Sequence, residues 1–231
     1  MAVGSLPNYI KALNNQPVKN GYVRFYRGHA CNKWNLEPSL LRAGNENLLE
    51  KETELIQELH IHYPEIFKDS ENIFEDLVIA QHYGIPTRLL DVTSNPLVAL
   101  YFAITNIPPK AENPEVLIID IPKDVVVYYD NQKVLDDLNN VIHSEGKPLH
   151  YPIACIKARL NNPRIVRQSG AFLLLSEKHD KREVVIEHIE LSKNNIRRLF
   201  TQLAGLGITT QSLFPELSQY ALCLKNKEIE L

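Results

Sequence analysis

Cysteine is too scarce in this sequence to build a disulfide framework. The 231 residues contain three cysteines, Cys31, Cys155 and Cys223, and no two of them have the spacing of a zinc ribbon or a redox pair. An odd number of widely separated thiols favours a reducing compartment. The N-terminus lacks the charged and then apolar segments of a signal peptide. We therefore expect a cytoplasmic protein.

Long hydrophobic runs and an excess of one charge are also missing. The longest uninterrupted apolar run, residues 97–104, has eight residues, whereas a membrane helix needs about 20. We therefore expect no membrane partner. The 25 basic and 28 acidic side chains give a net charge of −3, so no global basic field exists to hold duplex nucleic acid by counterion release. A local basic groove remains compatible with this composition.

Several common motifs of nucleotide, zinc and serine chemistry are absent. There is no Walker-type phosphate loop, no His-Glu-x-x-His and no Gly-x-Ser-x-Gly elbow. The Gly-x-Gly at Gly205 and Gly207 has no third glycine and follows no strand, so it does not make a dinucleotide fingerprint. His60 and His62 are two residues apart, which places them on different faces of a helix. The sequence predicts no metal site.

Hydrophobic periodicity and turn residues predict one α+β domain over residues 1–231. Helices are expected over residues 5–15, 47–67, 72–83, 96–105, 131–144, 192–204 and 215–226. Strands are expected over residues 21–27, 87–93, 116–121, 125–129, 153–156, 164–168, 171–176 and 183–190. The order shows no regular βα alternation. It therefore favours a central mixed or antiparallel sheet flanked by N-terminal and C-terminal helices.

Residues 81–96 carry the densest polar signal. One helix ends there, an extended stretch follows with Arg88 and Asp91, and a new helix opens at Pro96. The free N–H groups of that new helix favour an anion, and Thr93 stands at its mouth. Arg88 lies between apolar neighbours, so it needs a partner. Two readings stay open, namely a bound phosphate or a structural ion pair with Asp91.

Two further segments place basic or polar groups beside glycine. Arg27 ends a predicted strand and is followed by Gly28, which suits close approach of a ligand to the backbone. Arg27 is either a fork for phosphate or carboxylate, or a strand-end arginine in a surface ion pair. Downstream, Gln168 precedes Gly170 and follows two arginines. Its amide either orients a polar ligand or caps a loop.

Together these segments resemble the FRG domain family, which is named for a Phe/Tyr-Arg-Gly motif near its N-terminus. That motif stands here as Phe-Tyr-Arg-Gly at residues 25–28. Residues 82–103 resemble the long family signature, and residues 168–172 and 207–217 are similar to further family blocks. The family occurs widely in bacteria and phages and is largely uncharacterised. The resemblance therefore implies little about chemistry.

The order of motifs is also similar, more distantly, to that of arginine-type ADP-ribosyltransferases. In those enzymes a first strand ends in Arg-Gly and a hydroxyl-bearing strand then runs into a helix. Residues 26–28 and 92–94 are similar in order and kind. This resemblance implies NAD as the cofactor, with Arg27 holding the pyrophosphate and Thr93 supporting the nicotinamide ribose.

We therefore predict a nucleotide-binding protein with ADP-ribosyltransferase-like activity on a protein or nucleic acid, in a toxin or phage-defence role. The predicted catalytic residues are His82, Gln168 and Glu183. Ligand binding is assigned to a second group, Tyr26, Arg27, Gly28, Arg88, Asp91 and Thr93. Two alternatives remain open. One is a non-catalytic module that binds a phosphorylated ligand or a nucleic-acid end, and the other is a phage or host interaction protein.

Overall fold

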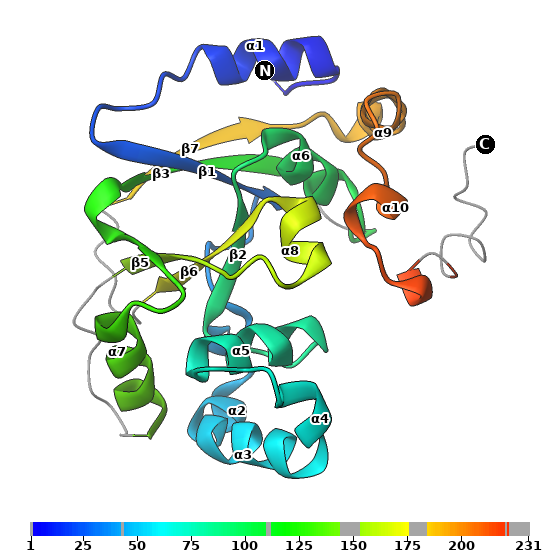
Figure 1. Cartoon of the computed structure of the whole chain (residues 1–231). Helices are drawn as coiled ribbons and strands as arrows, with labels where there is room; N and C mark the ends of the chain where they lie inside the picture. Colours follow the sequence, from blue (N-terminus) through cyan, green and yellow to red (C-terminus); the bar gives the residue numbers. More distant parts are fainter. Residues whose placement is uncertain are drawn as a thin grey trace.

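The structure is a computed structural model that describes residues 2–42, 44–109, 112–143, 153–175, 184–219 and 221. In these ranges, seven strands pair into one sheet in the order β4-β5-β6-β2-β1-β3-β7 (Figure 1). The strands are β1 (Tyr22–His29), β2 (Leu89–Thr93), β3 (Glu115–Pro122), β4 (Val126–Tyr128), β5 (Ile153–Lys157), β6 (Gly170–Leu175) and β7 (Val185–Glu190). The β4–β5 pair is parallel and the other pairs are antiparallel. A mixed sheet with flanking helices confirms the α+β class.

The register of the central strands brings distant segments to one end of the sheet. β1 pairs with β2 through Tyr26 and Thr93. On the other side of β2, Asp91 is paired with Phe172 and Thr93 with Gly170 of β6. Residues near positions 27, 91 and 170 therefore lie close together although more than 60 residues of chain separate each from the next.

Helices in two groups cover the sheet. They are α1 (Leu6–Asn14), α2 (Glu46–Glu50), α3 (Glu52–His62), α4 (Pro64–Phe67), α5 (Ile73–His82), α6 (Pro96–Ile104), α7 (Gln132–His143), α8 (Pro163–Gln168), α9 (Ile196–Ala204) and α10 (Thr210–Leu213). Helices α1, α6 and α9 share a buried cluster with β3 and β7. Helices α3, α5, α7 and α8 share another with β2, β5 and β6. Figure 1 shows the two groups over different halves of the sheet.

A third buried cluster lies on the opposite side of the strands. It joins Phe25, Leu90, Leu117 and Leu173 from four different strands. On β3 the residues alternate, with Val116 and Ile118 in the first helical cluster and the intervening residues in this one. Period-two alternation in β3 therefore separates two apolar cores.

The starts of α5 and α6 were predicted to within one residue, and in the structure an asparagine caps each helix. The Asn72 side chain accepts a hydrogen bond from the Glu75 N–H at 3.1 Å, where α5 begins. The Asn95 side chain accepts from the Leu97 N–H at 2.9 Å, with Pro96 in the first turn of α6. Both patterns follow the N-cap rule.

Two expected elements were wrong. Residues 164–168 were predicted as a strand but form most of helix α8, because Asn162 caps the segment and Pro163 opens it. The single helix over residues 47–67 is divided into α2, α3 and α4, with breaks at Lys51 and Tyr63. Half of the helix expected over residues 215–226 lies outside the described residues, and in the described half residues 217–219 and 221 are helical. Within the described ranges, no helix is long and apolar enough to cross a membrane.

Candidate ligand-binding site

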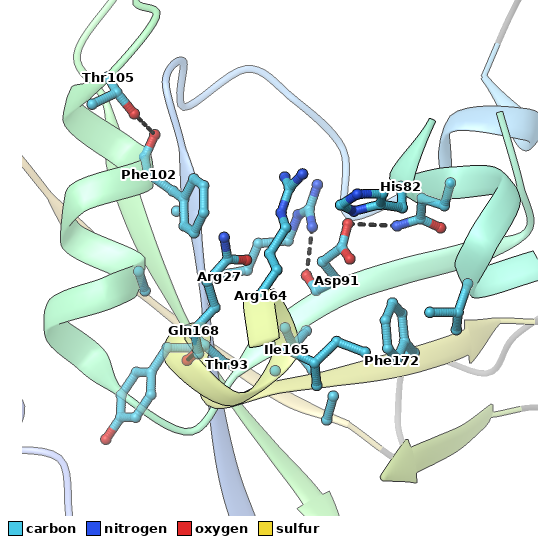
Figure 2. A pocket seen from close by; sticks show the side chains of 18 of the residues that line it. Arg27, His82, Asp91, Thr93, Phe102, Thr105, Arg164, Ile165, Gln168 and Phe172 are labelled. Carbon is cyan, nitrogen blue, oxygen red and sulfur yellow. Dashed lines mark hydrogen bonds between the residues drawn. The ribbon is translucent and has the colours of Figure 1, made fainter. Parts of the chain in front are cut away.

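A cavity of about 320 Å³ lies where the two groups of helices separate over β1 and β2. Its walls come from the ends of β1 and β2, the C-terminal turn of α5, one face of α6 and the short helix α8. Figure 2 shows Arg27, His82, Asp91 and Arg164 directed into this space. The cavity thus gathers residues from three stretches of the chain, within 26–34, 78–106 and 162–172.

Arg27 is a cavity residue with a buried donor that has no hydrogen-bond partner among the described residues. One of its terminal nitrogens, Nη1, donates to the backbone carbonyl of Asp91. Its Nε is buried and has no hydrogen-bond partner among the described residues. Burial lowers the pKa of Arg27, the Asp91 charge opposes that effect and the Arg42 charge adds to it. A buried N–H without an acceptor is costly, so this group favours an incoming acceptor, above all an anion.

Arg164 brings a second guanidinium into the same cavity from α8 (Figure 2). Its Cζ lies 4.8 Å from the centroid of the Phe214 ring, in a cation–π contact. No carboxylate of the described residues lies within salt-bridge distance of it. The planar group is therefore oriented by an aromatic ring while its charge remains uncompensated.

Asp91 supplies the one carboxylate among the described residues that line the cavity. The Gln81 side chain donates to its Oδ2 at 2.6 Å. The Gln81 amide oxygen in turn accepts from the Thr87 hydroxyl. Gln81 is thereby held in one orientation and fixes the carboxylate. With two guanidiniums against one carboxylate, the described lining favours a negatively charged ligand.

His82 stands at the end of α5 and at the edge of the cavity. Burial lowers its pKa from 6.5, and the Arg164 charge lowers it further. Glu216 opposes this shift, with its Oε1 at 3.7 Å from the His82 Nε2. Because the net shift is downward, the imidazole is predominantly neutral at pH 7.

Thr93 and Gln168 line the cavity, but their polar atoms mainly join its walls. The Thr93 hydroxyl donates to the Gln168 carbonyl at 2.6 Å and accepts from the Asn95 N–H at 3.0 Å. The Gln168 amide donates to the Leu213 carbonyl at 3.2 Å. These bonds tie the start of α6, the end of α8 and α10 together. The side chain of Asn95 already caps α6, where the sequence predicted an anion site.

Gly28 has to be a glycine because helix α6 packs directly against it. A Cβ atom at this position would lie 2.1 Å from the Ala99 carbonyl oxygen and 2.5 Å from the Ala103 nitrogen. Gly28 was expected to let a ligand approach the backbone closely. In the structure it is helix α6 that approaches the backbone at this position. Neighbouring Tyr26 is half-buried on the cavity wall.

Arg88 lies away from the cavity lining. It is 5% exposed and Glu52 of α3 is 4% exposed. The Arg88 Nε lies 3.0 and 2.9 Å from the two Glu52 carboxylate oxygens. Its predicted partners were Asp91 or a phosphate, and the structure pairs it with Glu52 instead. Glu183, the third predicted catalytic residue, lies outside the described residues.

Seven of the nine predicted site residues thus line one cavity, namely Tyr26, Arg27, Gly28, His82, Asp91, Thr93 and Gln168. Gln81, Arg164 and Phe102 also line the cavity and were not predicted as site residues. The Asn162-Pro163 pair was the missed signal for Arg164, because it starts a helix in the same way as Asn95-Pro96. The roles assigned to these residues remain predictions.

A family model described as the FRG domain matches residues 23–112. The match supports the resemblance seen in the sequence and spans the cavity walls from β1 to α6. The cavity residues of α8 and β6 lie outside the matched range. No curated protein and no solved structure matches the chain. The resemblance to ADP-ribosyltransferases therefore has no support from these comparisons.

Proposed function

We propose that the cavity binds a phosphorylated small molecule that carries a flat ring, with a nucleotide as the simplest such ligand. The observation that carries this proposal is the buried Nε of Arg27, which has no partner among the described residues and shares the cavity with Arg164. Guanidinium groups bind phosphate through paired N–H donors. A phosphate between the two arginines would accept from the free Arg27 nitrogen and balance the excess positive charge.

The ring is inferred from the aromatic walls. Phe102 and Phe172 line the cavity on opposite sides of the arginines (Figure 2). Phe102 also makes an edge contact with Phe214, at a centroid distance of 5.9 Å. Bases stack on aromatic side chains with little sequence preference. A volume of about 320 Å³ is near the small end of ligand pockets, about 300–1,000 Å³. It favours a mononucleotide-sized group.

NAD-dependent ADP-ribosyl transfer is a second candidate, and one observation favours it. A further cavity of about 500 Å³ adjoins the first and shares His82 with it. The two together offer room for a dinucleotide. In this version of the proposal Arg27 binds the pyrophosphate, and the target is a protein or nucleic acid. Such an activity would suit a toxin or a phage-defence effector. A non-catalytic module that only binds the nucleotide would use the same contacts.

Thermal unfolding with inorganic phosphate, AMP, ADP, ADP-ribose and NAD tests the proposal. A ligand at a hundred times its dissociation constant adds about 2.7 kcal/mol of stability, which is a measurable rise in Tm. We expect this rise with at least one nucleotide in the wild type and its loss in Arg27→Ala. Arg167→Ala is the matched control, because Arg167 is an exposed residue of α8 outside the described lining.

Two results would count against the proposal. A Tm that no nucleotide shifts would contradict it, and so would an equal shift in Arg27→Ala. Release of nicotinamide from NAD then separates the two candidates. Catalytic release supports the transferase, whereas binding without release supports a non-catalytic module.

A further inference from the structure

The second cavity adjoins the first along a shared wall. Val78, His82, Asn162 and Ile165 line both. The second cavity continues toward α4 and the segment after α10, where Glu216 lies. The two cavities are therefore neighbours, and His82 lies on their common wall.

Glu216 offers an unused acceptor in that second space. Its Oε2 is buried and has no hydrogen-bond partner among the described residues. Its other oxygen, Oε1, lies 3.7 Å from the His82 Nε2, which is too far for a normal hydrogen bond. A buried carboxylate oxygen normally has a donor, because leaving it without one costs the full desolvation penalty.

The neighbouring basic side chains do not donate a hydrogen bond to Glu216 Oε2. His82 is predominantly neutral at pH 7, because burial and Arg164 lower its pKa. Arg159 is the arginine among the described residues of the second cavity. It is already bound to Glu75, at 2.8 and 2.6 Å, and to Glu71 at 2.6 Å. Glu216 therefore remains available to a donor that comes from outside the described residues.

We propose that the ligand spans both cavities and that Glu216 binds a hydrogen-bond donor at its far end. The first cavity has a donor that lacks an acceptor, Arg27 Nε, and the second has an acceptor that lacks a donor, Glu216 Oε2. One molecule with a phosphate at one end and an N–H or O–H group at the other would satisfy both. This inference rests on the proposed phosphate site. It narrows the ligand to phosphorylated compounds that end in an amino or hydroxyl group.

Binding of matched nucleotides tests it by calorimetry. AMP carries an amino group that purine riboside 5′-monophosphate lacks, and 2′-deoxy-AMP lacks one hydroxyl. Losing the donor would leave Glu216 unsatisfied, so we expect one of the two analogues to bind the wild type about tenfold more weakly than AMP. Which analogue is weakened tells whether the donor is the amino or the hydroxyl group. In Glu216→Gln the difference between AMP and that analogue should disappear.

Asp69→Asn is the matched control, since Asp69 lines the same cavity and its substitution should leave the tenfold difference intact. The unliganded Glu216→Gln protein should keep its Tm, because an amide replaces a carboxylate of the same shape. Equal affinities for all three nucleotides, with binding still lost in Arg27→Ala, would overturn this inference alone. The same holds if the difference between analogues survives in Glu216→Gln. Failure of phosphate and every nucleotide to bind would overturn the phosphate site itself, and this inference with it.

Discussion

Gly28 and Ala99 lie so close that a methyl group on Gly28 would be 2.1 Å from the Ala99 carbonyl oxygen. This contact sets the distance between β1 and α6. It also places Arg27, the preceding residue, in the wall of the cavity that α6 borders. The glycine of the Tyr-Arg-Gly sequence thus has a packing role, and the adjacent Arg27 has a buried Nε without a hydrogen-bond partner among the described residues.

Gly28→Ala should therefore destabilise the fold. The new methyl group meets helix backbone, which cannot move without shifting α6, so we expect a loss of about 3 kcal/mol in the free energy of unfolding. Urea denaturation measures this. Gly170→Ala is the control, because the nearest atom to its added Cβ is 3.6 Å away. Equal stability of the two variants would contradict the proposed packing role.

The buried pair of Arg88 and Glu52 leads to a second prediction. Arg88→Leu leaves the Glu52 carboxylate buried without its cation, which should cost about 3–5 kcal/mol of stability. The double variant Arg88→Leu/Glu52→Leu should recover most of that loss, because no charge remains unpaired. Urea denaturation of the two variants and the wild type gives the comparison. A single variant as stable as the wild type would show that the pair does not support this part of the fold.

The pKa of His82 reports the electrostatic effect of the Arg164 charge. Burial is the largest cause of the lowered His82 pKa and the Arg164 charge is the next. Arg164→Ala should raise the His82 pKa toward 6.5, as measured by NMR titration of the imidazole. Arg167→Ala changes charge on the same helix and should leave that pKa nearly unchanged. A larger shift in Arg167→Ala than in Arg164→Ala would contradict the placement of Arg164 beside His82.

Acidification should destabilise the protein through His29. This histidine is 2% exposed, and its Nδ1 lies 3.5 Å from Glu115 without making a hydrogen bond. Burial lowers the His29 pKa from 6.5, and the favourable effect of Glu115 does not offset it. Between pH 6.5 and the lower folded pKa, the unfolded chain binds more protons. The free energy of unfolding therefore falls as pH falls, by at most about 1.4 kcal/mol per pH unit for this group.

Urea denaturation between pH 7.5 and pH 5 measures this slope. His82 also has a lowered pKa and acts in the same direction, so the informative quantity is the difference between the wild type and His29→Gln. The variant should show the shallower dependence on pH. Parallel curves for the two proteins would mean that His29 does not titrate differently on folding.

Local signals predicted much of this fold because they act over a few residues. Asn95-Pro96 marked the start of α6, and Gly84 marked the end of α5, where it has a φ of 88°. The same Asn-Pro pair at residues 162–163 was interpreted as a turn between strands, and a strand was predicted in place of most of α8. Short helices are the least distinct in periodicity, because six residues give fewer than two turns.

Long-range partners could not be predicted in the same way. The sequence showed that Arg88 needed an anion, but not that Glu52, 36 residues away on α3, would supply it. Nearby Asp91 was the natural candidate, yet its carboxylate faces Gln81. Arg27, Asp91 and Gln168 meet at one cavity because β6, β2 and β1 are neighbours in the sheet. Local sequence patterns do not determine this strand order.

The decisive measurement for a phosphate site between Arg27 and Arg164 is the affinity with which Arg164→Ala and Arg167→Ala bind a nucleotide. Both remove one arginine from α8, but only Arg164 lies among the described residues of the cavity wall. If a phosphate binds between Arg27 and Arg164, calorimetry with ADP should show binding at least about tenfold weaker in Arg164→Ala and nearly unchanged in Arg167→Ala. Equal affinities in the two variants would contradict a phosphate site between these arginines.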